Sequence, residues 1–178
     1  MLVLTAALLI STLASAASGQ SPSQTPPPAP AKAAPSEAKK AFDKLTAMAG
    51  SWEGTIMGTP ISGTIRPVSS GTAVLHEMTA GGGNPVPQQE ITMFYVEDDR
   101  LFAIHYCDGG NRVRWEGKAS ADGTGIAFTM LDVAGGTRGG LLKSVAFNLI
   151  DADTHVLQGT FVMPDGKPVE LSGEFKRK

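Results

Sequence analysis

The feature that most constrains the fold of this 178-residue chain is a two-residue alternation that runs from Ser51 to the C-terminus. Apolar and polar residues alternate in short runs, and each run ends at a cluster of Gly, Asp, Asn or Pro. Such a pattern is typical of strands that bury one face. The runs that we predict as strands are 51–57, 61–68, 72–79, 90–96, 101–107, 112–119, 125–133, 141–150, 155–163 and 168–176. The sequence therefore predicts an all-β domain of about ten strands.

Most connections between these runs are short enough to be hairpin turns. They include residues 97–100, 120–123, 151–153 and 164–167. Tight turns join neighbouring antiparallel strands, so the strands should follow one another as an up-and-down meander. Two longer glycine-rich connections, 80–86 and 134–140, are predicted to be loops over an opening.

A meander of ten twisted strands removes its open edges most simply by closing into a barrel. A β-sandwich would show the same alternation, but Greek-key sandwiches need long crossover connections. We therefore predict a ten-stranded antiparallel up-and-down barrel and keep the sandwich as the alternative. A barrel of this size has room for a ligand.

One short helix is predicted before the strands. Ser36 is a suitable N-cap, and Phe42 and Leu45 recur at helical spacing before Gly50 offers a stop.

The N-terminus has the layout of a cleavable signal peptide. Residues 1–16 form an apolar run followed by small residues, and Ala14 and Ala16 fit an A-x-A cleavage site. The apolar run is shorter than the roughly 20 residues needed to span a bilayer, so we expect no membrane span after cleavage. Residues 17–35 hold no large apolar side chain and are predicted to be a disordered Pro/Ala-rich tether. The barrel domain is then 36–178, exported to the periplasm or the cell exterior.

Cysteine content and charge narrow the function classes. Cys107 is the only cysteine, so no intrachain disulfide can form, although an exported protein meets oxidising conditions. The formal net charge is −2, and the basic residues are too sparse to follow a phosphate backbone. We therefore predict no nucleic-acid partner.

The segment FDKLTAMAGSWEG, residues 42–54, resembles the start of the calycin barrels, the lipocalins and their relatives. In these proteins a G-x-W motif, here Gly50 and Trp52, closes the barrel floor. The resemblance implies that Lys176 or, in our assignment, Arg177 packs on the tryptophan ring by a cation–π contact.

A second stretch, H-Y-C-x-x-G-N-x-x-R, resembles an uncharacterised family of exported bacterial β-barrel proteins. It is matched here by residues 105–107, Gly110, Asn111 and Arg114, and it implies a fold but no activity. We expect Asn111 to be a left-handed turn residue with a structural role. Nitrobindin-like haem barrels share the architecture, but their haem-ligating histidine does not align clearly with a histidine of this chain. We therefore predict no cofactor, with haem as a minor alternative.

His105 and Cys107 are the residues best suited to carry chemistry. They share one face of their strand and would line the cavity together if that face is the inner one. Two residues apart on a strand, they lie about 6.5 to 7 Å apart along the backbone, which is too far for a dependable Cys–His nucleophile. The three histidines show no metal-binding spacing, so we predict no metal site.

Glu77 is adjacent to His76 on its strand, so only one of the two can face inward, and the resemblance favours Glu77. A buried Glu77 would need a cation, which Arg112 or Arg114 could supply across the barrel. Tyr106 and Trp115 are candidate aromatic walls of the same site, although core packing is the stronger expectation for each. His155 is expected to be exposed and is given no role.

Three functions fit these residues. The leading hypothesis is a binding protein that holds a small hydrophobic or amphipathic molecule in the barrel. The second is an enzyme that uses Glu77, His105, Cys107 and Arg114 in the same cavity. The third is an envelope scaffold with a solid core.

Overall fold

The computed structural model describes residues 34–81 and 88–178, and these form one helix, a 3₁₀ turn and ten strands. Helix α1 spans Glu37–Ala47. The strands are β1 (Gly50–Ile56), β2 (Thr59–Val68), β3 (Ala73–Ala80), β4 (Gln88–Glu97), β5 (Arg100–Tyr106), β6 (Asn111–Ala119), β7 (Gly125–Gly135), β8 (Leu141–Leu149), β9 (Thr154–Val162) and β10 (Pro168–Arg177). Each predicted strand is present, with bounds that differ by at most a few residues. The signal peptide, most of the tether and most of the 80–86 loop lie outside the described residues.

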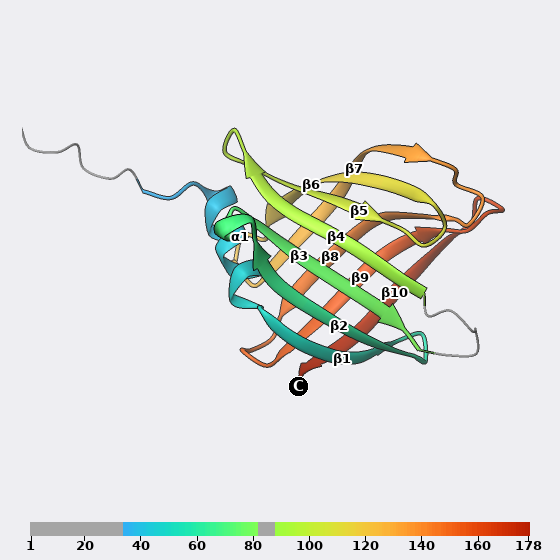
Figure 1. Cartoon of the computed structure of the whole chain (residues 1–178), viewed down its shortest axis with the longest axis horizontal. Coiled ribbons are helices and arrows are strands. Elements are labelled where there is room, and N and C mark those ends of the chain that lie inside the picture. The colour runs from blue at the N-terminus through green and yellow to red at the C-terminus, as the bar shows by residue number, and fades with distance from the viewer. Residues whose placement is uncertain (1–33, 82–87) are drawn as a thin grey trace, which may run out of the picture. The chain divides into compact units, whose positions relative to one another are not determined.

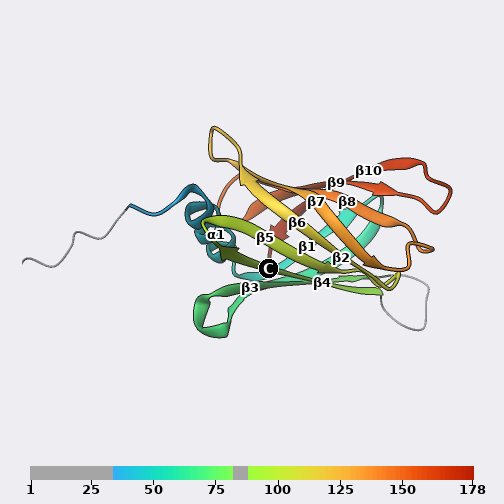
Figure 2. The same ribbon diagram turned by 90° about the horizontal axis from the view of Figure 1, so that it is seen from above.

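The ten strands form a closed antiparallel barrel in which each strand pairs with its neighbours in the sequence. Strand β1 completes the closure by pairing with β10, where Trp52 lies opposite Arg177 and Gly54 opposite Phe175. Figures 1 and 2 show the strands wrapping around one axis. The prediction of an up-and-down barrel is confirmed, and the sandwich alternative is wrong.

Helix α1 covers one end of the barrel (Figure 1). Its N-cap is Ser36, as predicted, because the Ser36 hydroxyl accepts a hydrogen bond from the backbone N–H of Lys39. Phe42 and Leu45 face the barrel and are buried. Each such side chain contributes about 1.5 to 3 kcal/mol when it is removed from water. This end of the barrel is therefore closed by apolar packing.

Aromatic side chains fill the barrel above the helix. Phe94, Phe128 and Phe147 are each about 1% exposed and contact one another edge-on or tilted, with ring centroids 5.2 to 6.4 Å apart. Trp115, also 1% exposed, lies on the neighbouring part of the inner wall. This part of the interior is a packed core and not a channel.

Arg177 packs on the ring of Trp52, with its guanidinium carbon 4.4 Å from the ring centroid. The same guanidinium donates hydrogen bonds to the carbonyl oxygens of Ala49, at 2.6 Å, and Ala152, at 2.8 Å. Gly50 is required beside it, because a Cβ at Gly50 would overlap Arg177 Nη1 and the backbone φ there is +149°. The cation–π contact that the calycin resemblance implies is therefore present, made by Arg177.

Two expectations about single residues are wrong. His155 is 2% exposed and stacks on Phe175, with ring centroids 5.3 Å apart, because it lies on the same inward face of β9 as the buried Leu157. Asn111 is also buried and opens β6, and the left-handed residue of that turn is Gly110, with φ +86°. The Asn111 amide donates to the Gly140 carbonyl at 2.9 Å, so its role is to tie two turns together.

In the part of the chain that the structure describes, no helix is long and apolar enough to cross a bilayer.

The Arg177 contact should contribute measurably to stability. We expect Arg177→Met to lower the free energy of unfolding by about 2 to 3 kcal/mol, since it removes a cation–π contact and charge-assisted hydrogen bonds. Lys176→Met is the matched control, because Lys176 is the preceding residue and its side chain is 72% exposed. Urea unfolding followed by circular dichroism measures both. Equal effects of the two substitutions would contradict the assignment.

His155 should make the barrel sensitive to acid. Burial, with a smaller effect of the Arg177 charge, lowers the pKa of His155 from its usual 6.5 to about 4. Between these values the unfolded chain binds a proton that the folded chain does not, so stability falls as the pH drops from 6.5 to 4. This corresponds to up to about 3 kcal/mol. In His155→Phe the free energy of unfolding should fall less across this interval, whereas an unchanged slope would rule out this role.

Candidate functional site

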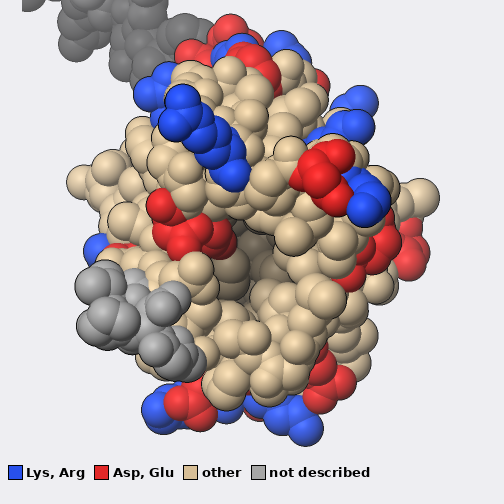
Figure 3. Space-filling view, turned by 90° about the vertical axis from the view of Figure 1, so that its right-hand side faces the viewer, with Lys and Arg blue, Asp and Glu red and all other residues tan. Residues whose placement is uncertain are grey.

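A cavity of about 360 Å³ opens at the end of the barrel opposite α1. Figure 3 looks onto this end and shows the hollow, with acidic side chains at one edge. We call this space the mouth cavity. Its apolar wall comes from the ends of four strands and consists of Ile56, Ile61, Met78, Ala80 and Phe161. Its polar side is formed by Gln88 and Glu90 of β4 and Asp108 of the β5–β6 turn.

The polar side continues down the inner wall between β4 and β5. Thr92 lies opposite His105 in the register of these strands, and the next inward positions toward the mouth are Glu90 and Cys107. The thiol of Cys107 donates a hydrogen bond to Glu90 Oε1 at 3.4 Å. His105 Nε2 is 3.8 Å from Glu90 Oε2. Glu90, His105 and Cys107 therefore form one cluster, with a ligand atom of each within 4.8 Å of the others.

The His105 ring is fixed on two sides. Its Nδ1 is 3.0 Å from the hydroxyl oxygen of Thr92, and its face stacks on Trp115 at a centroid distance of 5.0 Å. The ring is 1% exposed, and Nε2 has no hydrogen-bond partner. Burial lowers the pKa of His105 to about 4, so the ring is neutral at physiological pH.

Burial also acts on the two other members of the cluster. It raises the pKa of the Glu90 carboxyl and raises the pKa of the partly buried Cys107 thiol to about 12. The nearby carboxylates of Glu90 and Asp108 raise the pKa of the thiol further. Cys107 is therefore protonated at neutral pH and is a poor nucleophile.

The predicted inward placement of Glu77 is wrong. His76 is the inward member of the pair, being 5% exposed and lining the interior, whereas Glu77 lies on the outer surface with Arg66 and Thr64. Alternation allows only one of two adjacent residues inside. The apolar interior accepts the neutral imidazole, since burial lowers the pKa of His76 to about 3.

Arg114 and Tyr106 also lie outside the barrel. Arg114 forms an ion pair with Asp132 at 2.6 Å, and Tyr106 is 50% exposed. The predicted cluster of Glu77, His105 and Arg114 therefore does not form. Trp115 does face inward, and its contact with His105 places it beside the site as well as in the core.

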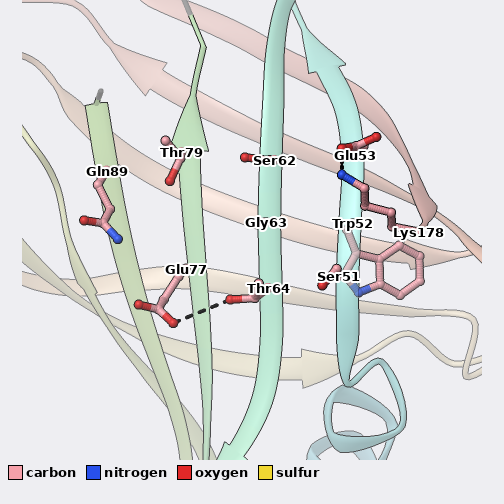
Figure 4. A pocket seen from close by; sticks show the side chains of 10 residues that line it. All are labelled: Ser51, Trp52, Glu53, Ser62, Gly63, Thr64, Glu77, Thr79, Gln89 and Lys178. Carbon is pink, nitrogen blue, oxygen red and sulfur yellow. Dashed lines mark hydrogen bonds and ion pairs between the residues drawn. The ribbon is translucent and has the colours of Figure 1, made fainter. Parts of the chain in front are cut away.

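A second depression, of about 330 Å³, lies on the outer surface of β1, β2 and β3 (Figure 4). Its charged groups interact with one another or with neighbours. Lys178 Nζ is 2.5 Å from Glu53 Oε1, and Thr64 donates to Glu77 at 3.5 Å. Among the described residues, none of the buried polar atoms that lack a hydrogen-bond partner lies in this depression, whereas His105 Nε2 and Trp115 Nε1 lie on the inner wall, so the mouth cavity is the better candidate site.

Glu90 is the functional candidate that the sequence reasoning missed. The sequence signal for it was the short turn predicted at residues 97–100, and the structure centres this turn on Asp98 and Asp99, both of which have positive φ. Counting back along the two strands from this turn pairs Thr92 with His105, and two steps further Glu90 with Cys107.

The histidines do not lie where a porphyrin could reach them. His76 and His105 face an inner cavity of about 20 Å³, which holds about one water molecule. His155 packs between Trp52 and Phe175. Within residues 34–81 and 88–178, the histidines therefore do not fit haem.

Comparison with known proteins identifies the fold. The chain matches no protein-family model, and no curated protein is significantly similar to it in sequence. The crystal structure of Rv2717c from M. tuberculosis is similar, with a TM-score of 0.61, 12% identity, and coverage of 78% of this chain and 97% of that one. At this identity the likeness shows a shared barrel fold alone.

Two further structures match more loosely. The S-type phycobiliprotein lyase CPES from Guillardia theta has a TM-score of 0.40 and 9% identity, covering 80% of this chain and 97% of its own. A de novo designed fluorescence-activating β-barrel has a TM-score of 0.41 and 17% identity, and the match covers 76% of this chain and 98% of the designed one.

Proposed function

We propose that this protein is an exported barrel that binds a small apolar or amphipathic molecule in the mouth cavity. The observation that carries the proposal is the cavity itself. A volume of about 360 Å³ falls within the range of about 300 to 1,000 Å³ that is common for small-molecule sites.

The composition of the cavity wall supports the same function. One side, which includes Ile61, Met78 and Phe161, is apolar and would cover the body of a ligand. The other side carries Gln88, Glu90 and Asp108, which would orient a polar group. This division suits an amphipathic molecule better than a purely polar one.

The geometry favours binding over the two alternatives. An enzyme built from Glu77, His105, Cys107 and Arg114 lacks two of its four groups inside the barrel, and its thiol is protonated. A solid scaffold fits the aromatic half of the interior but not the mouth.

Filling the mouth should weaken binding of an apolar probe. We expect the wild-type protein to bind the uncharged dye Nile red with a rise in fluorescence. Ala80→Trp places an indole in the cavity wall and should weaken binding by at least about tenfold, which corresponds to about 1.4 kcal/mol.

The matched control is Ala134→Trp, since Ala134 is exposed on β7 and does not line the cavity. This variant should bind the dye as the wild type does. Equal loss in both variants, or no binding by the wild type, would contradict the proposed function and favour the scaffold.

Export is supported by the signal-peptide pattern of residues 1–16. We expect the mature protein to begin at Ala17, which intact-mass measurement of the extracytoplasmic fraction would show. Ala14→Lys should block cleavage, because the A-x-A site requires small residues. Ser18→Leu lies beyond the site and should be processed normally. A mature chain that retains residues 1–16 would overturn the assignment.

A further inference from the structure

We propose that Glu90, His105 and Cys107 form a binding site for one Zn²⁺ ion, with a fourth coordination position open to the mouth cavity. A carboxylate, an imidazole and a thiolate are the three ligand types that Zn²⁺ takes in proteins. Sites with three protein ligands and an open position are typical of reactive zinc centres.

The spacing of the ligand atoms fits this ion. With bonds of about 2.0 to 2.3 Å at tetrahedral angles, Zn²⁺ holds its ligand atoms about 3.3 to 3.8 Å apart. The two oxygens of Glu90 each approach one of the other ligands, with Oε1 at 3.4 Å from Cys107 Sγ and Oε2 at 3.8 Å from His105 Nε2. One oxygen of Glu90, His105 Nε2 and Cys107 Sγ lie within 4.8 Å of one another, so side-chain rotations of Glu90 and Cys107 would bring the three ligand atoms to the spacing that zinc requires.

The unpartnered nitrogen of His105 is the independent sign of a ligand. A buried polar atom normally has a hydrogen-bond partner, and leaving one without costs about 1 to 3 kcal/mol. His105 Nε2 is buried and unpartnered, and it points toward the Glu90 carboxylate. A metal ion at this point would satisfy it.

The surroundings of His105 resemble the outer shell of a metal site. The Thr92 hydroxyl can accept the Nδ1 proton, which leaves the lone pair on Nε2 for the metal. Stacking on Trp115 fixes the plane of the ring. Thr92 is therefore a positioning residue for this site.

Charge also favours a cation here. Among the described residues that line the mouth cavity, acidic groups are present and Lys and Arg are absent. With a coordinated thiolate, Glu90 and Cys107 together would carry two negative charges, which one Zn²⁺ neutralises. The thiol proton leaves to solvent when the metal binds.

Zinc titration of the metal-free full-length mature protein tests the site. Isothermal titration calorimetry should show one Zn²⁺ per chain. Cys107→Ala and Glu90→Gln should each weaken binding by at least about 100-fold, because losing a ligand costs more than the 10- to 100-fold cost of outer-shell changes. Thr92→Val should weaken it by about tenfold.

Glu77→Gln is the matched control, since it removes a carboxylate from the outer face of the neighbouring strand. It should bind Zn²⁺ as the wild type does. Circular dichroism checks that each variant folds. If Cys107→Ala does not fold, Cys107→Ser takes its place.

Cobalt substitution provides a readout that a purely structural cluster would not change. Co²⁺ in the wild-type site should show a thiolate-to-metal charge-transfer band and the strong visible bands of a four-coordinate ion. Cys107→Ala should lose the charge-transfer band. Absence of stoichiometric binding, or of the charge-transfer band, would overturn the proposal.

The two proposals fail separately. Ala80→Trp should lose Nile red and keep Zn²⁺, whereas Cys107→Ala should lose Zn²⁺ and keep the dye.

Discussion

The pairing of β1 with β10 is the constraint on which the rest of the structure depends. An open ten-stranded sheet would expose two rows of unpaired backbone groups and an apolar face, and closure removes both. Trp52 and Arg177 lie opposite each other at this seam, so the cation–π contact joins the first strand to the last. Gly50 leaves room for the guanidinium, and Met48 accepts a hydrogen bond from the Trp52 indole. The seam thereby also sets where α1 lies.

The apolar packing of α1 against one end of the barrel determines where space remains inside it. Phe42 and Leu45 close the floor, and the phenylalanine rings above them occupy the middle of the barrel. The remaining space is at the mouth, where an apolar wall and a polar side enclose a cavity. A protein that needed only a stable core would gain from continuing the apolar packing to the end. The open mouth is therefore better explained by binding than by stability.

The global fold was predictable because many residues contribute to each signal. Alternation and turns in ten strands predict closure even when single boundaries shift by a residue. The candidate site was less predictable because successive side chains of a strand point alternately into and out of the barrel. An error of one residue therefore moves a side chain from one face to the other. The choice of Glu77 over His76 as the inward residue followed the resemblance and was wrong, and His155 was placed outside because it was taken as the exposed first residue of its strand. Glu90 required cross-strand register, which becomes visible only when the hairpin turn is fixed first.

The polar groups of the interior are not distributed evenly, and their distribution carries functional information. His76 packs edge-on against Phe147, His155 packs against Trp52 and Phe175, and burial keeps both neutral, which a packed core tolerates. Glu90, His105 and Cys107 differ because their ligand atoms lie within 4.8 Å of one another and Glu90 lines the mouth cavity. A buried carboxyl beside a thiol and an unpartnered imidazole destabilises a barrel that has no use for it. A bound cation would turn the same three groups into a stabilising centre, and the adjacent cavity gives that centre access to a ligand.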